Sequence, residues 1–251
     1  MHRTASQRSC DRRRQPFRDL VLTVSVALGL LAWSVPNTSA QQGNPNPRIV
    51  PPNAVYDGLT YGEWMAKFNQ WYLSIPASVN PLILGNEKYL SIGQPEHLWF
   101  LGNTEPVVER HFVVPAGTAL FATIFIVEWD NLLCVDPDTN YTVDELRALA
   151  KSVVDSFTDI QVEVDGVPVK DVAQYRSTTP VFSVTLSDEN FPQSIGCTDV
   201  LPGTYGPMVA DGYALILPPL PVGEHTVHEA GVLHDIVVDV TWHIAVVPPN
   251  H

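Results

Sequence analysis

Apolar and polar residues alternate along much of the chain, which predicts β-strands. The clearest run places six apolar residues on one face: Ile236, Val238, Val240, Trp242, Ile244 and Val246. A period of two is typical of a half-buried strand. Similar runs span residues 97–101, 107–114, 160–165, 181–186, 213–217 and 224–229. Residues 118–127 are apolar on both faces, as expected of a strand that is covered on both sides.

Two other segments repeat apolar residues every three or four positions, which predicts helices. The first follows Thr60 and Glu63, which have the spacing of a capping box. Its apolar stripe consists of Tyr61, Trp64, Met65, Phe68, Trp71 and Tyr72. We expect this stripe to pack on the core, and the alternative is an exposed aromatic platform for sugars. The second helix is predicted over residues 143–155, after a capping box at Thr142 and Glu145.

Eight to ten strands with two amphipathic helices indicate a mainly β fold. Short connections rich in Pro and Gly favour a β-sandwich with the helices at its edge or end. The pair Asp165-Gly166 predicts a tight hairpin. We assign this single domain to residues 56–251, and an extended lead-in rich in Pro and Asn to residues 41–55.

Residues 1–40 have the pattern of a signal peptide. Six arginines precede an apolar run from Leu20 to Val35, and the small residues Thr38, Ser39 and Ala40 suit cleavage. The apolar run is shorter than the roughly 20 residues that a spanning helix needs. We therefore expect a secreted or periplasmic protein, with an uncleaved N-terminal anchor as the alternative.

Removal of this leader would make the chain strongly acidic. The whole chain has a formal net charge of −13, and residues 1–40 carry six Arg against Asp11 and Asp19. The remaining part is therefore near −17. Such a charge repels nucleic acid phosphates and anionic lipid. We expect neither nucleic acid nor an anionic membrane surface as a partner, and leave an extracellular ligand of unknown type.

Two cysteines, Cys134 and Cys197, remain after cleavage, because Cys10 lies in the leader. In an exported chain, such a pair is most simply one disulfide. Close by, Asp136, Asp138 and Asn140 have the alternating oxygen ligands of a calcium loop. The sequence lacks two further positions of an EF-hand, so an acidic turn before a capped helix explains the same residues. We expect no cofactor, with calcium as the alternative.

Two groups of polar residues are candidates for chemistry. The predicted C-terminal hairpin carries His225, His228, Glu229, His234, Asp235, Asp239 and His243. Convergence would make a metal or acid–base site, whereas a hydrated sheet face explains them equally. Glu109, Glu128 and Asp130 lie on neighbouring predicted strands, and paired carboxylates can hydrolyse glycosides. The sequence contains no motif of a serine hydrolase, zinc protease, phosphate loop or dinucleotide fold.

Several segments resemble a group of secreted bacterial proteins of unknown function. One is Tyr61-Gly-Glu-Trp64 through Trp71, followed by Ile75-Pro76 and Asn80-Pro81. The second and third are His97-Leu-Trp-Phe-Leu-Gly102 and, after Arg110, Val114-Pro-Ala-Gly-Thr-Ala-Leu-Phe121. The others are Asp211-Gly-Tyr213 and Pro219-Leu-Pro-Val-Gly-Glu-His-Thr-Val227. Members of that group often have cysteines near the second and third of these segments, and this chain has none there. The resemblance implies export and a single domain, but no activity.

The sequence therefore supports two functional hypotheses. The first is a non-catalytic exported β-sandwich that acts in binding or as a surface or matrix component. The second is a secreted hydrolase of polysaccharide or another polymer, which would use carboxylates such as Glu109, Glu128 and Asp130. Whether the protein is an enzyme stays open at this stage.

Overall fold

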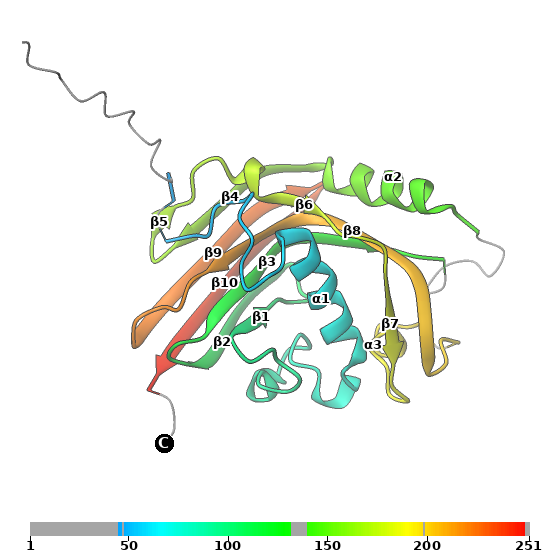
Figure 1. Cartoon of the computed structure of the whole chain (residues 1–251), viewed down its shortest axis with the longest axis horizontal. Helices are drawn as coiled ribbons and strands as arrows, with labels where there is room; N and C mark the ends of the chain where they lie inside the picture. Colours follow the sequence, from blue (N-terminus) through cyan, green and yellow to red (C-terminus); the bar gives the residue numbers. More distant parts are fainter. Residues whose placement is uncertain (1–44, 47, 132–139, 198, 249–251) are drawn as a thin grey trace, which may run out of the picture. The chain divides into compact units, whose positions relative to one another are not determined.

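The computed structural model describes residues 45, 46, 48–131, 140–197 and 199–248, all of which belong to one unit spanning residues 42–251. These residues form ten strands in two five-stranded mixed sheets, with helices packed against them (Figure 1). The prediction of a mainly β fold of the sandwich class is therefore confirmed.

The first sheet has the order β1-β3-β8-β6, and β7 pairs with another part of β8. Its strands are β1 (Leu98–Leu101), β3 (Ala119–Trp129), β6 (Arg176–Thr178), β7 (Phe182–Leu186) and β8 (Gly203–Leu217). The short strand β1 runs parallel to β3 and pairs only with residues 119–122. Among the described residues, no strand pairs with this edge of β3 beyond Ala122.

The second sheet has the order β2-β10-β9-β4-β5. Its strands are β2 (Val107–Pro115), β4 (Phe157–Val164), β5 (Val167–Pro168), β9 (Gly223–Leu233) and β10 (Ile236–Val247). Strands β9 and β10 form a long antiparallel hairpin, whereas β10 and β2 run parallel. The predicted Asp165-Gly166 turn joins β4 to β5, and both of its residues have positive φ angles.

The two predicted helices are present and begin where their caps place them. Helix α1 (Tyr61–Ser74) has a complete capping box between Thr60 and Glu63, and α2 (Val143–Val154) has one between Thr142 and Glu145. They lie on opposite sides of the first sheet (Figure 1). The structure adds a short helix α3 (Phe191–Ser194) and three 3-10 helices, η1 (Ala77–Val79), η2 (Glu87–Tyr89) and η3 (Val172–Tyr175).

The core lies on both faces of the first sheet. Residues 119–125 of β3 and residues 208–217 of β8 are all buried, so the prediction of a strand covered on both sides is confirmed. Trp64, Phe68 and Trp71 of α1 are 5–6% exposed, which excludes the sugar-platform alternative. Gly62 allows α1 to approach β6, because a Cβ at this position would lie 2.2 Å from the carbonyl oxygen of Thr178.

Two parts of the sheets extend beyond the predictions. Strand β8 begins at Gly203 instead of residue 213, and β6 was not expected at all. The lead-in also contributes to the core through Ile49 and Val50, and the Val50 amide donates a hydrogen bond to the Ile216 carbonyl. The packed part of the chain therefore starts before residue 56.

Candidate functional site

A cavity of about 460 Å³ lies beside the open edge of β3, where α1 and the second sheet meet. Five aromatic side chains line it: Phe68, Tyr72, Phe125, Phe157 and Phe191. Phe68 and Tyr72 are four residues apart on α1, with ring centres 5.2 Å apart. Phe125 of β3 stacks on Phe157 of β4 at 4.5 Å, and Phe191 of α3 meets Tyr72 edge-on at 5.4 Å. The walls are therefore mainly apolar, with the five rings as their largest side chains.

Two carboxyl groups from different sheets also line this cavity, Glu128 of β3 and Glu229 of β9. Glu229 is 1% exposed, and the Asn103 side-chain amide donates to its Oε1 at 3.3 Å. Glu128 is half-buried as a residue, but its Oε1 is fully buried. Within the described part of the chain, neither Glu128 Oε1 nor Glu229 Oε2 has a hydrogen-bond partner. A buried oxygen without a hydrogen-bond partner destabilises the folded protein, and a ligand that donates a hydrogen bond to it would remove this cost.

Burial controls the protonation of both carboxyl groups. It raises the pKa of Glu229 well above the ordinary value, and the hydrogen bond from Asn103 opposes this shift only in part. Burial also raises the pKa of Glu128, and the adjacent Asp130 adds charge repulsion and a hydrogen bond in the same direction. The pKa of the Tyr72 phenol is likewise raised, first by burial and then by Glu128 and Asp130. Burial thus favours the neutral form of both carboxyl groups.

One end of the cavity reaches the surface. Thr104, Glu105 and Pro106, which precede β2, line this end and are exposed, and so is Ile236, the first residue of β10. Among the described residues that line the cavity, none is Lys, Arg or His. Aromatic faces and carboxyl groups both attract cations, so this lining favours a cationic ligand over an anionic one.

The buried position of Glu229 predicts a pH-dependent stability. Because its pKa is raised in the fold, the folded chain retains a proton that the unfolded chain releases above its ordinary pKa of about 4.5. Stability therefore falls as the pH rises from that value through the raised pKa. Glu229→Gln keeps the shape of the neutral acid and cannot ionise. Its melting temperature should exceed that of the wild type at pH 8, by a margin that shrinks towards pH 5.

Glu224→Gln is the matched control, because Glu224 lies on the same strand but is exposed. Thermal melts of both variants across this pH range provide the measurement. If Glu229→Gln and the wild type lose stability in parallel as the pH rises, the Glu229 carboxyl does not titrate as its burial implies.

The structure divides the three acids that the sequence grouped together. Glu128 and Asp130 are neighbours at the end of β3, and Asp130 is 3% exposed. Glu109 lies on β2 in the second sheet, and its side chain is 76% exposed, beside His243. The sequence left open whether the three acids approach one another, and the structure places Glu109 apart from the other two. The sequence did not predict that Glu229 lines the same cavity as Glu128.

The polar residues of the C-terminal hairpin do not converge on one site. His225 contacts Asp165 at 3.0 Å, whereas His228 contacts Asp239 at 3.1 Å. His228 pairs with Thr241, and Thr226 with His243, so these residues share one face, as the alternation predicted. Glu229 lies on the other face and points into the protein. Most of this group is therefore a hydrated sheet face.

Three of the predicted ligand and disulfide positions, Cys134, Asp136 and Asp138, lie outside the described residues. Asn140 is described and exposed, just before α2. Cys197 follows α3 and packs against the core while partly buried. The Cys134–Cys197 disulfide and the calcium loop both stay predictions.

Comparisons with family models, with curated proteins and with solved structures gave no match for this chain. The described helices include none that combines the length and the apolar character needed to cross a membrane. The cavity and the exposed side chains are therefore the features that can indicate a function.

Proposed function

We propose that this chain is an exported binding protein whose ligand is a small organic cation with an apolar body. The observation that carries this proposal is the pair of unpartnered carboxyl oxygens, on Glu128 and Glu229, in an aromatic cavity. The apolar body would pack against the rings, and the cationic group would meet the two acids.

The size and lining of the cavity support a small-molecule ligand. Its volume of about 460 Å³ falls within the range of about 300–1,000 Å³ that is typical of ligand pockets. Such pockets are mostly apolar and contain a few placed polar groups, here Glu128, Glu229 and the amides of Asn69 and Asn103, with Glu105 at the open end. A ligand cation over an aromatic face gains on the order of 0.5–2 kcal/mol in addition to its hydrophobic contact.

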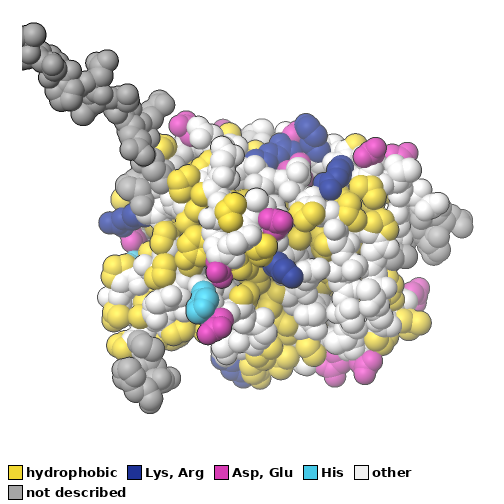
Figure 2. All heavy atoms as spheres, viewed as in Figure 1, with side chains coloured by type: hydrophobic (Ala, Val, Ile, Leu, Met, Phe, Trp, Pro, Cys, Tyr) yellow, Lys and Arg dark blue, Asp and Glu magenta, His cyan; other side chains and the backbone are white. Residues whose placement is uncertain are grey.

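Charge also supports a cationic ligand. The export of a chain with a net charge near −17 would place a negative field around the cavity, and this field attracts cations. On the face drawn in Figure 2, the basic side chains are scattered and form no continuous patch. Export itself remains part of the proposal and is supported by the pattern of residues 1–40.

The geometry favours binding over hydrolysis. A glycosidase needs one carboxylic acid and one carboxylate, so the environments of its two acids must separate their pKa values. Here burial raises the pKa of both Glu128 and Glu229. As neutral acids, Glu128 and Glu229 supply proton donors but no charged nucleophile or base, and Asp130, the charged acid beside Glu128, is not among the residues that line the cavity. The hydrolase hypothesis therefore has less support than binding.

Binding of a cation should depend on Glu229 and should release protons. We expect thermal-shift screening of matched amine and alcohol pairs, beginning with phenethylamine and 2-phenylethanol, to select the amines. Glu229→Gln should weaken amine binding about tenfold or more, because a hydrogen bond to a charged group contributes about 1.5–3 kcal/mol. Calorimetry in two buffers of different ionisation enthalpy should detect the proton that the carboxyl loses.

Glu224→Gln controls for the loss of one negative charge from the same strand. The proposal fails if the alcohols stabilise the protein as much as the amines. It fails equally if Glu229→Gln and Glu224→Gln bind the amines alike.

A further inference from the structure

A second cluster lies on the outer face of the second sheet. Strands β2 and β10 are parallel neighbours, and their register places His243 opposite His111 and Thr241 opposite Glu109. Residues two apart on a strand share a face, so Glu109, His111 and His243 all point to the same side. Glu109 and His111 are exposed, and His243 is half-buried.

The three side chains are close enough to share one ion. One ligand atom from each lies within 4.8 Å of the others. The two imidazole rings are stacked, with centres 4.5 Å apart and planes 11° apart, so they extend from the sheet in the same direction. His243 Nε2 lies 3.7 Å from Glu109 Oε2. Ligands at about 2.0–2.1 Å from a tetrahedral ion are about 3.3 Å apart, so small side-chain rotations would complete the site.

We propose that Glu109, His111 and His243 bind a divalent transition-metal ion of the zinc or copper class, with water in the remaining positions. Two imidazole nitrogens and one carboxylate oxygen suit zinc, copper and nickel better than calcium or magnesium, which prefer oxygen ligands. Three protein ligands with one open position are characteristic of exposed or catalytic zinc sites.

The strands hold these ligands in place before any ion arrives. Strand β10 lies between β2 and β9, and its pairing with β2 continues from Asp239 to Val247. Side chains on such strands are positioned more precisely than side chains on loops. The neighbouring His228 already contacts Asp239, and His225 contacts Asp165, so each has a local carboxylate partner. This site is separate from the cavity, because Glu229 lies on the opposite face of the sheet.

Titration calorimetry of the untagged full chain with Zn²⁺ tests the proposal. We expect one equivalent to bind, and we expect His243→Ala to weaken that binding at least about tenfold, since one of the three ligands is lost. His97→Ala is the matched control, because His97 is exposed, precedes β1 and contacts only the adjacent Glu96 among the described ion pairs. It should bind like the wild type.

Glu109→Gln provides a second variant that keeps the shape of the side chain and lies on an exposed position of an edge strand. It should also weaken Zn²⁺ binding. With Cu²⁺ as the probe, electron paramagnetic resonance should detect two coordinating imidazoles in the wild type and one in His243→Ala. Failure of the wild type to bind Zn²⁺, or equal binding by His243→Ala and His97→Ala, would overturn the assignment.

Discussion

Replacement of Arg110 by methionine should lower the free energy of unfolding by about 3–5 kcal/mol, the cost of breaking a buried ion pair. The side chain of Arg110 is 1% exposed and lies in β2. It donates to the carbonyl oxygens of Pro81 and Leu82 at 2.5 and 2.7 Å. It also pairs with the Glu87 carboxylate at 2.9 Å. Methionine fills a similar volume but removes the guanidinium from all three groups. The Leu82 carbonyl then keeps only the Thr104 hydroxyl as a donor, and Glu87 Oε1 keeps the Gly85 amide but loses its cation.

Lys88→Met is the matched control, because Lys88 carries the same charge, follows Glu87 directly and is exposed. Its effect should stay within about 0.5 kcal/mol. Urea unfolding of both variants gives the comparison. Adding Glu87→Gln to Arg110→Met should restore part of the lost free energy of unfolding, since the second change removes the carboxylate that no longer faces a cation. An unchanged unfolding free energy in Arg110→Met would show that the loop at residues 81–87 does not depend on this arginine.

The helices could be predicted because their signals are local. In both helices, a threonine and a glutamate three residues later satisfy the first free amides, and this arrangement needs no distant contact. The aromatic spacing of α1 then identified its buried side. The sequence could also predict most strands, because alternation depends only on which face of each strand is buried.

The first half of β8 was missed because its residues do not look like a strand. It contains Gly203, Gly206, Pro207 and Gly212, which ordinarily mark turns. Gly212 is tolerated because the chains approach closely there. A Cβ at this position would lie 2.1 Å from the Phe125 carbonyl oxygen. Tertiary contact therefore overrides the local preference.

The candidate cavity could be anticipated only in part. Glu128 was singled out as an acid on a predicted strand, but its orientation depends on a β-bulge between Thr123 and Phe125. A bulge shifts the alternation by one residue, and nothing in the run of apolar residues signals it. The presence of Glu128 and Glu229 in one cavity depends on how the two sheets pack. Glu229 did carry a signal, because it is an acid at an apolar position between Val227 and Gly231.

The histidine pair illustrates the same limit. His243 was a candidate within the C-terminal hairpin, whereas its stacking partner His111 was not considered, because β2 is more than 100 residues away in the sequence. Their contact follows from the parallel pairing of β2 with β10. Alternation predicts the face that a side chain occupies, but it does not predict which strand lies next to it.

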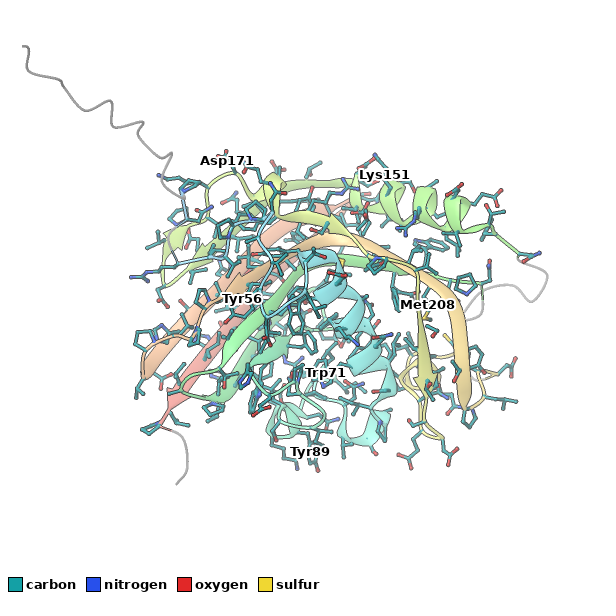
Figure 3. The ribbon with its side chains drawn as sticks, viewed as in Figure 1. Tyr56, Trp71, Tyr89, Lys151, Asp171 and Met208 are labelled. Carbon is teal, nitrogen blue, oxygen red and sulfur yellow. The ribbon has the colours of Figure 1, made fainter. Side chains whose placement is uncertain are left out.

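Trp71 joins α1 to the loop that follows it. Its ring is 6% exposed and packs against Phe100 at 5.4 Å and Phe68 at 6.0 Å. Its Nε1 donates to the carbonyl oxygen of Ile92 at 2.8 Å. Figure 3 shows Trp71 beside the lower part of α1, towards the loop that carries Tyr89. The side chain therefore contributes both hydrophobic burial and a hydrogen bond that closes the loop on the helix.

Trp71→Ala should destabilise the protein by about 3–5 kcal/mol, because truncation of a buried aromatic side chain leaves a cavity. Here it also leaves the Ile92 carbonyl without the donor that Trp71 provides. Trp71→Phe keeps an aromatic ring and loses the donor, so its cost should be smaller. Lys67→Ala, at an exposed position of the same helix, should be close to neutral. Chemical denaturation of the three variants gives the order of their stabilities from their midpoints. Equal midpoints for Trp71→Ala and wild type would mean that the α1 stripe is not part of the core.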